Sequence, residues 1–213
     1  MKTSSAQNPE PVRTGRPKSE AKRHAILEAS AHLFMTRGFK DTSVDAVASQ
    51  AGVSKQTVYS HFNGKNALLR ACVEKKVEEY GLGAENLAHD VPMQEALSRF
   101  GRQFVDLLID EDVLCMYRLL ISEATAHPDL TLVFFESGPR PTREAMAQFL
   151  AHHPEGGPRF DDPQHAAERF FALLEHTNVM HRLLNLAGPM TAQARTEHAE
   201  RTAAAFMRMY PAV

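Results

Sequence analysis

The chain has 213 residues, 43% of them hydrophobic and 23% charged, with a formal net charge of −2; these values are typical of a globular protein of one or two domains. No apolar run is long enough to cross a bilayer, and residues 1–13 have no apolar segment like that of a signal peptide, so we expect a cytoplasmic protein. The two cysteines, Cys72 and Cys115, are too few for a disulfide framework or a cysteine-based zinc site.

The small net charge conceals an uneven distribution along the chain. Residues 1–65 carry ten Lys and Arg against five Asp and Glu, whereas residues 66–213 carry fourteen against twenty-one. A basic N-terminal third on an acidic body favours contact with a polyanion at one end of the molecule, although a basic surface is more often simply solvated.

Four helices are expected in the first third, after a polar tail over residues 1–14. They are predicted over 19–37, 44–51 and 55–61, and onward from residue 65. Apolar residues recur at helical spacing in the first of them, and Gly38 ends that run in the position that glycine favours. Gly52 and the pair Asn63-Gly64 end the next two helices, and Ser54 is a good N-cap for the third.

The rest of the chain also has only helical periodicity, without strand-like alternation or internal repeats. Helices are predicted over 92–109, 113–126, 128–136, 142–152, 163–186 and 191–209. Proline or glycine marks the breaks between them, and Gly81 and Gly83 are expected to bend or end the fourth helix. We therefore predict an all-α protein with a flexible basic arm over 1–18, a helix-turn-helix domain over 19–65 and a larger helical domain over 66–213.

Residues 42–62 have the pattern of a helix-turn-helix. Their apolar positions can form one shared core: Val44, Val47, Ala51, Val53, Val58 and Phe62. Ala48 is small where two helices must cross, Gly52 supplies a left-handed turn residue, and Ser54 restarts the helix at once. A helical corner without a role in DNA binding shares only part of this pattern.

Residues from about 22 to 69 resemble the N-terminal domain of the TetR family of transcriptional regulators. The matching residues are Ile26, Ala29, Leu33, Phe34, Gly38, Phe39, Thr42, Val44, Val47, Ala48, Ala51, Gly52, Val53, Ser54, Thr57, Val58, Tyr59, His61, Phe62, Lys65, Leu68 and Leu69. Two residues depart from the pattern: Gly64 replaces the Ser or Asn that often caps the fourth helix, and Asn66 replaces a common acidic residue. The resemblance implies an N-terminal three-helix DNA-binding domain joined to a helical ligand-binding and dimerisation domain.

The resemblance and the chemistry of DNA together suggest roles for the third helix. Its first residues are expected in the major groove, where Lys55 reads guanine and Gln56 reads adenine. Phosphate, sugar or thymine-methyl contacts are expected from Thr42, Ser43, Ser54, Thr57, Tyr59, Ser60, His61 and Lys65. Packing is the alternative role for Tyr59, since its ring can do both. Arg16 is expected in an A·T-rich minor groove, or else as a loose phosphate contact.

The larger domain is expected to provide a dimer interface and a ligand cavity. The resemblance implies that the last two helices form a four-helix bundle with a second copy, through Phe170, Leu173, Met180, Leu183, Leu184, Ala203 and Phe206. It also implies a cavity for a small, mostly apolar ligand, near Phe100, Phe104, Met116, Tyr117, Leu120, Phe134, Phe171, His176 and Asn178. Both apolar sets fit an ordinary intrachain core equally well, and the polar residues Arg118, Glu123, His176 and Asn178 fit buried ion pairs or a solvated surface as well as ligand contacts.

The sequence has no pattern typical of catalysis or of metal binding: it has no Gly-rich phosphate loop, no nucleophile elbow and no Glu-x-x-His pair. We therefore expect no enzyme, cofactor or metal; a redox role for Cys72 or Cys115 stays open, although buried free cysteines are usually inert. The favoured function is a TetR-like repressor that binds a palindromic operator as a homodimer and is released by a ligand. The alternative is a helical protein-interaction or enzyme module whose helix-turn-helix no longer binds DNA, and salt-dependent DNA binding would distinguish the two.

Overall fold

The structure, a computed structural model, describes residues 16–152, 160–175 and 177–210. In these ranges all regular elements are helical, as expected. The first four are α1 (Arg16–Asp41), α2 (Val44–Gln50), α3 (Lys55–His61) and α4 (Lys65–Glu79). The others are the 3-10 helix η1 (Ala84–Asn86), α5 (Met93–Leu108), α6 (Glu111–Glu123), α7 (Pro128–Ser137), α8 (Pro139–Ala151), α9 (Pro163–Leu174), α10 (Thr177–Leu183) and α11 (Ala192–Met209). No helix in the described ranges combines the length and the apolar character that a bilayer-spanning segment needs.

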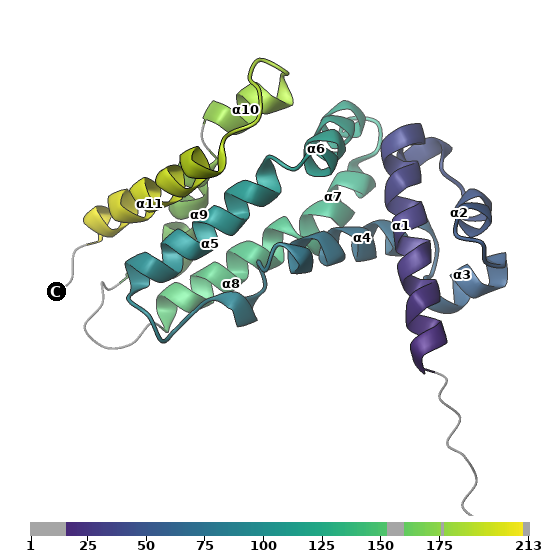
Figure 1. Cartoon of the computed structure of the whole chain (residues 1–213), viewed down its shortest axis with the longest axis horizontal. Coiled ribbons are helices and arrows are strands. Elements are labelled where there is room, and N and C mark those ends of the chain that lie inside the picture. Colours follow the sequence, from purple (N-terminus) through teal and green to yellow (C-terminus); the bar gives the residue numbers. More distant parts are fainter. Residues whose placement is uncertain (1–15, 153–159, 176, 211–213) are drawn as a thin grey trace, which may run out of the picture.

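Helices α1, α2 and α3 form one end of the molecule, and α4 runs from them into the body (Figure 1). Their common core consists of side chains that are fully or almost fully buried: Ile26, Leu33, Phe34, Val47, Val58, Phe62, Leu68 and Leu69. Gly52 has a φ of +65° in the turn between α2 and α3, a conformation that glycine adopts without a steric penalty. This end has the predicted helix-turn-helix architecture.

The two ends of α1 differ from the prediction. The helix begins at Arg16, so residues 16–18, which were expected in the flexible arm, have helical backbone. At its other end it reaches Asp41, but Gly38 interrupts it with a φ of +81°, at the position where the sequence predicts a stop.

Gly64, one of the two departures from the family pattern, has a φ of +87° and a ψ of −174° directly before α4. This backbone conformation is strained for any residue with a Cβ. Gly64 provides no side-chain cap, so the start of α4 must be held by other contacts.

The body packs its helices around an aromatic core. Helix α5 lies along α11, α8 lies along α9, and α4 packs against α7. The rings that fill the centre are almost fully buried: Phe100, Phe104, Phe170, Phe171 and Phe206. Helix α4 ends at Glu79, with Tyr80 as its C-cap and Gly81, which has a φ of +64°, directly after it. This agrees with the predicted end of the fourth helix.

The prediction of a single helix over 163–186 is wrong, because the structure has two helices there, α9 and α10. Glu175 leaves the helical region with a φ of −72° and a ψ of +49°, although no proline or glycine marks this point. Arg118 of α6 holds the end of α10 in place by donating to the carbonyl oxygens of Arg182 and Leu183, at 2.7 and 2.9 Å.

Candidate nucleic-acid interface and adjoining cavity

The outer face of α3 has exposed polar side chains at its N-terminal end. Lys55 and Gln56 are exposed, Tyr59 is 51% exposed, and Val58 faces inward with no exposed surface. The Ser54 hydroxyl caps the helix by accepting from the Thr57 backbone N–H at 3.1 Å. The predicted base-reading positions are therefore open to a partner.

Lys55 has a partner that the sequence did not predict. Its ammonium lies 2.9 Å from a carboxylate oxygen of Asp45, in the first turn of α2, and both side chains are more than half exposed. The hydrogen bond and the charge of Asp45 raise the pKa of Lys55. This ion pair orients the Lys55 side chain toward α2.

Other hydroxyls on this surface are occupied by local hydrogen bonds. Ser43 caps α2 by accepting from the Ala46 N–H, and Ser60 donates to the Thr57 carbonyl at 2.7 Å. The Ser54 and Thr57 hydroxyls lie 2.8 Å apart. Each still has an unused donor or acceptor position for a phosphate. His61 is half-buried, and its ring lies beside that of Phe62.

Thr42 does not face the expected phosphate. It is only 2% exposed, and its hydroxyl lies 2.7 Å from the Gly38 carbonyl oxygen and 3.1 Å from that of Leu33. The side chain ties the start of α2 to the end of α1. The expectation that Thr42 contacts DNA is therefore wrong.

Lys65 is also used inside the protein. Its ammonium donates to the carbonyl oxygens of Phe39 at 2.6 Å and Lys40 at 3.1 Å, and it lies 4.4 Å from the centre of the Phe39 ring. Burial lowers the pKa of Lys65, while the charge of Asp41 opposes this shift. Lys65, which was expected to bind phosphate, thus connects the start of α4 to the end of α1. Arg16 begins α1, and its side chain lies outside the described residues.

A cavity of about 420 Å³ lies between this domain and the body. Residues from α1, α4, α5, α6, α7 and α8 line it. Four predicted pocket residues are on its wall: Phe104, Met116, Tyr117 and Phe134. Its α4 wall includes Cys72, Val73 and Val77, so anything that fills the cavity contacts the helix that leads to α3.

A second, more open hollow of about 850 Å³ lies between α6, α7 and α10, and we call it the groove. Leu120, Tyr117 and Phe134 line it. Phe100 and Phe171 line neither space because they are buried in the core, so we correct the expected lining accordingly. Asn178 is half-buried and lines neither, and His176 lies outside the described residues.

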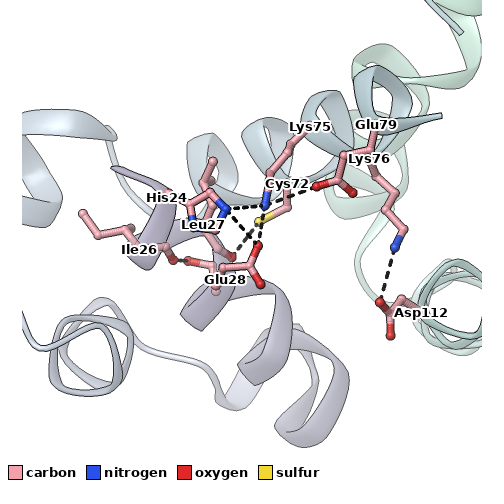
Figure 2. Close-up of polar contacts among 10 residues, drawn as sticks. His24, Ile26, Leu27, Glu28, Cys72, Lys75, Lys76, Glu79 and Asp112 are labelled. Carbon is pink, nitrogen blue, oxygen red and sulfur yellow. Dashed lines mark hydrogen bonds and ion pairs between the residues drawn. The ribbon is translucent and has the colours of Figure 1, made fainter. Parts of the chain in front are cut away.

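Ionic contacts join α4 to its neighbours (Figure 2), and most of the residues that make them also line the cavity. Lys75 binds Glu28 of α1 and lies 3.3 Å from Glu79, while Lys76 lies 3.2 and 3.3 Å from Asp110 and Asp112. Although burial opposes their charge, these carboxylates raise the pKa of both lysines. The hydrogen bond from Lys75 lowers the pKa of Glu28. The sequence carries no signal for the contacts of Lys75 with Glu28 and of Lys76 with Asp110 and Asp112, since these partners lie far apart along the chain. Lys75 and Glu79, by contrast, are an i,i+4 pair within α4.

Cys72 lies beside this cluster, with its sulfur 3.6 Å from the Leu27 carbonyl oxygen (Figure 2). Burial raises the pKa of the Cys72 thiol to about 12. A thiol with such a pKa is a poor nucleophile at neutral pH, which argues against a redox role for this residue.

The predicted dimer residues divide into two groups. Phe170, Ala203 and Phe206 have no exposed surface and belong to the core of a single chain, so they cannot contact a partner. On α9 and α10, Leu173 is partly exposed and Met180 is 55% exposed; Leu184, just after α10, is 59% exposed. Leu183 is half-buried.

Both the N-terminal and the C-terminal part of the chain match models of known protein families. A family model described as "Bacterial regulatory proteins, tetR family" matches residues 26–72, and one described as "AefR-like transcriptional repressor, C-terminal domain" matches residues 95–212. The regulator EthR of Mycolicibacterium smegmatis is 31% identical over 98 residues, 45% of each chain. The uncharacterized regulator YerO of Bacillus subtilis is 31% identical over 99 residues, 45% of this chain and 34% of that protein. The chain thus matches less than half the length of these curated relatives.

Solved structures match nearly the whole chain. A putative TetR-family regulator from Mesorhizobium loti has a TM-score of 0.74 and 26% identity, covering 93% of this chain and 100% of that one. The flavonoid-responsive regulator FrrA has a TM-score of 0.70 and 31% identity, covering 90% and 98%. With a helix-turn-helix at one end and a matching helical body behind it, the chain belongs to the TetR family of bacterial transcriptional regulators.

Proposed function

We propose that this chain is a cytoplasmic, homodimeric repressor that binds a palindromic operator through α3 and is released by a small, mostly apolar ligand. One observation carries the proposal: α4 begins directly after α3 and also forms a wall of the cavity. Lys65 ties its first turn to the end of α1. A ligand that displaces α4 therefore acts on the DNA-binding surface without touching it.

For DNA contact we assign base reading to Lys55 and Gln56, the exposed long side chains at the start of α3. Backbone contacts come from the exposed or partly exposed polar groups around them: Ser43, Ser54, Thr57, Tyr59, Ser60 and His61. Arg16 keeps its proposed role in the minor groove. The ion pair with Asp45 supports a Lys55 ammonium that is held ready at the surface and changes partner when DNA arrives.

Dimerisation is supported by the exposed apolar side chains Leu173 on α9, Met180 on α10 and Leu184 just after α10. Exposed apolar side chains of this size are often part of protein interfaces. A two-fold dimer presents two copies of α3 to successive major grooves, which matches an inverted-repeat operator.

The cavity supports a ligand response. Its volume of about 420 Å³ lies within the range of small-molecule sites, and its aromatic lining suits an apolar body. FrrA is named as flavonoid-responsive, which supports a small-molecule response in this chain as well.

The test is selection of bound fragments from a random DNA pool by the full chain, followed by affinity measurements at several salt concentrations. We expect an inverted repeat, with affinity that falls as salt rises. Gln56→Ala should relax the preference at one position of each half-site, by roughly 1–3 kcal/mol, whereas Gln50→Ala, at the exposed end of α2, should leave the consensus unchanged. Absence of any selected sequence would instead favour a helical interaction module.

A further inference from the structure

The cavity and the groove share one wall. Five residues line both spaces: Leu108, Tyr117, Phe134, Pro139 and Arg143. Three of them are apolar, so Tyr117 and Arg143 supply the polar side-chain groups of this wall. Glu175 lines only the groove. At the shared wall a ligand in either space therefore meets Tyr117 and Arg143. The other charged side chains of the cavity, on α1, α4 and α6, are already held in the ion pairs of Lys75 and Lys76 described above.

Arg143 and Glu175 form a neutral pair at this wall. One terminal nitrogen of Arg143, Nη2, donates to Glu175 Oε1 at 2.7 Å, and the other donates to the Pro139 carbonyl oxygen at 3.3 Å. The guanidinium carbon lies 5.1 Å from the centre of the Phe171 ring. A guanidinium has five N–H donors and a carboxylate several acceptor positions, so both partners keep hydrogen-bonding capacity for a ligand.

Tyr117 is partly buried, and its hydroxyl makes no hydrogen bond within the described part of the chain, so it is free to bind a ligand. Its ring lies edge-on to Phe134, with 5.3 Å between the ring centres. Burial raises the pKa of Tyr117 to about 12; the charge of Glu175 adds to this shift and that of Arg143 opposes it. The hydroxyl is therefore neutral and lies within the field of the ion pair.

We propose that Tyr117, Arg143 and Glu175 recognise the neutral hydroxyl of a phenol whose aromatic body fills the cavity between Phe104 and Met116. The proposal rests on the proposed function, since it takes the cavity as the effector site. A hydroxyl can donate to Glu175 and accept from Arg143 or Tyr117, so all three groups are satisfied. A ligand carboxylate would face Glu175 and a ligand ammonium would face Arg143, and an uncompensated charge is unfavourable at a partly buried site.

Three probes with one common body test this charge preference. They are 4-phenylphenol, biphenyl-4-carboxylate and protonated 4-(aminomethyl)biphenyl, titrated calorimetrically into the full-length chain at neutral pH. We expect 4-phenylphenol to bind at least about tenfold more tightly than either charged probe. Equal or tighter binding of a charged probe, or no binding of any of the three, would overturn the proposal.

Two variants test the residues. Tyr117→Phe keeps the ring and should weaken 4-phenylphenol by about tenfold, whereas Tyr80→Phe removes a hydroxyl that binds Asp110 and lies on neither hollow, and should not change this affinity. Glu175→Gln frees Arg143 from its counter-charge and should shift the preference toward biphenyl-4-carboxylate. Thermal unfolding of each variant checks that it is folded. Unchanged 4-phenylphenol affinity in a folded Tyr117→Phe protein would refute the assignment.

Operator affinity, measured with and without 4-phenylphenol, separates this proposal from the proposed function. If 4-phenylphenol binds with the expected preference but does not change operator affinity, recognition of a phenol stands and ligand release fails. If an apolar compound releases DNA while 4-phenylphenol shows no preference over its charged analogues, ligand release stands and recognition of a phenol fails.

Discussion

Lys65 holds the end of one helix to the start of the next with a single ammonium group. It binds two carbonyl oxygens at the end of α1 and lies over the Phe39 ring. Because Gly64 offers no side-chain cap, this contact is a main restraint on the first turn of α4. A lysine at this position could neutralise a phosphate, but Lys65 instead holds two helices of the protein together.

Lys65→Met should therefore reduce stability rather than phosphate binding. Loss of two charge-assisted hydrogen bonds at a partly buried position should lower the free energy of unfolding by about 1–2 kcal/mol. The slope of log affinity against log salt should not change, since a lost phosphate contact would reduce it by about one unit. Lys40→Met, on an exposed neighbour, is the control for loss of a positive charge. A reduced slope together with unchanged thermal stability would show that Lys65 binds phosphate after all.

The Cys72 thiol should be inert in the folded protein. With a pKa of about 12, its thiolate fraction at pH 8 is about one in ten thousand. Alkylation with iodoacetamide, followed by mass spectrometry, should label Cys72 only slowly in buffer and readily in guanidinium chloride. Fast labelling of Cys72 under native conditions would reopen a redox role.

At the scale of elements, the corner between α7 and α8 packs closely against α4. A Cβ at Gly138 would lie 2.8 Å from Val73 Cγ1 and 3.3 Å from Val77 Cγ2, both on α4. Gly138 also lines the cavity, so the contact lies beside the proposed effector site. Glycine at this corner is what allows α4 to lie so close to it.

Gly138→Ala should force α4 away from the corner. We expect a loss of about 1–3 kcal/mol in stability, as for other overpacked sites, and a weaker affinity for the operator. Val73→Ala in the same chain removes the nearer methyl group and should restore part of both losses, which a double-mutant cycle measures. Gly188→Ala meets no atom within 4 Å and is the matched control. Additive effects of the two substitutions would contradict direct contact through this corner.

Local patterns predicted the elements better than they predicted the roles of polar residues. The helix-turn-helix followed from apolar spacing, Gly52 and Ser54, because these signals lie within about twenty residues. The roles of Thr42 and Lys65 could not be predicted in this way. A hydroxyl or an ammonium group can bind a phosphate or the carbonyl oxygens at a helix end, and only the folded structure shows which of these lies nearby. The ion pair of Lys55 with Asp45 is local, but it depends on the angle between α2 and α3, which the pattern does not give. The pair of Lys75 with Glu28 and the division between α9 and α10 depend on contacts between distant segments, for which a single sequence has no signal.

At the scale of the whole molecule, exposure separates surface from core among the last helices. Met180 and Leu184 are more than half exposed, whereas Phe206 is fully buried although it belongs to the same predicted interface. Apolar periodicity alone marks both kinds of position in the same way. We therefore propose that a second copy meets the exposed side of α9 and α10, not the inner face of α11.

Aspartate substitutions should distinguish these positions. Met180→Asp and Leu184→Asp should raise the dimer dissociation constant by at least about a hundredfold, because a charge without a partner would be buried in the interface. Their circular dichroism should stay that of a folded helical protein. Phe206→Asp should instead unfold the chain. Sedimentation velocity at micromolar concentration checks the first expectation, and a persistent dimer in both exposed-site variants would place the interface elsewhere.

Because α4 is long, a small tilt of the helix displaces its end by several ångströms. Its fifteen residues span about 22 Å at about 1.5 Å per residue. If the helix pivots near Gly81, a tilt of about 10° carries its Lys65 end, and α3 with it, through about 4 Å over that length. In a two-fold dimer the two displacements are opposite and add to about 8 Å, against a groove repeat of about 34 Å. In the proposed dimer, a small angular change beside the cavity would thus be amplified along the helix until the two α3 helices no longer fitted the pitch of the duplex together.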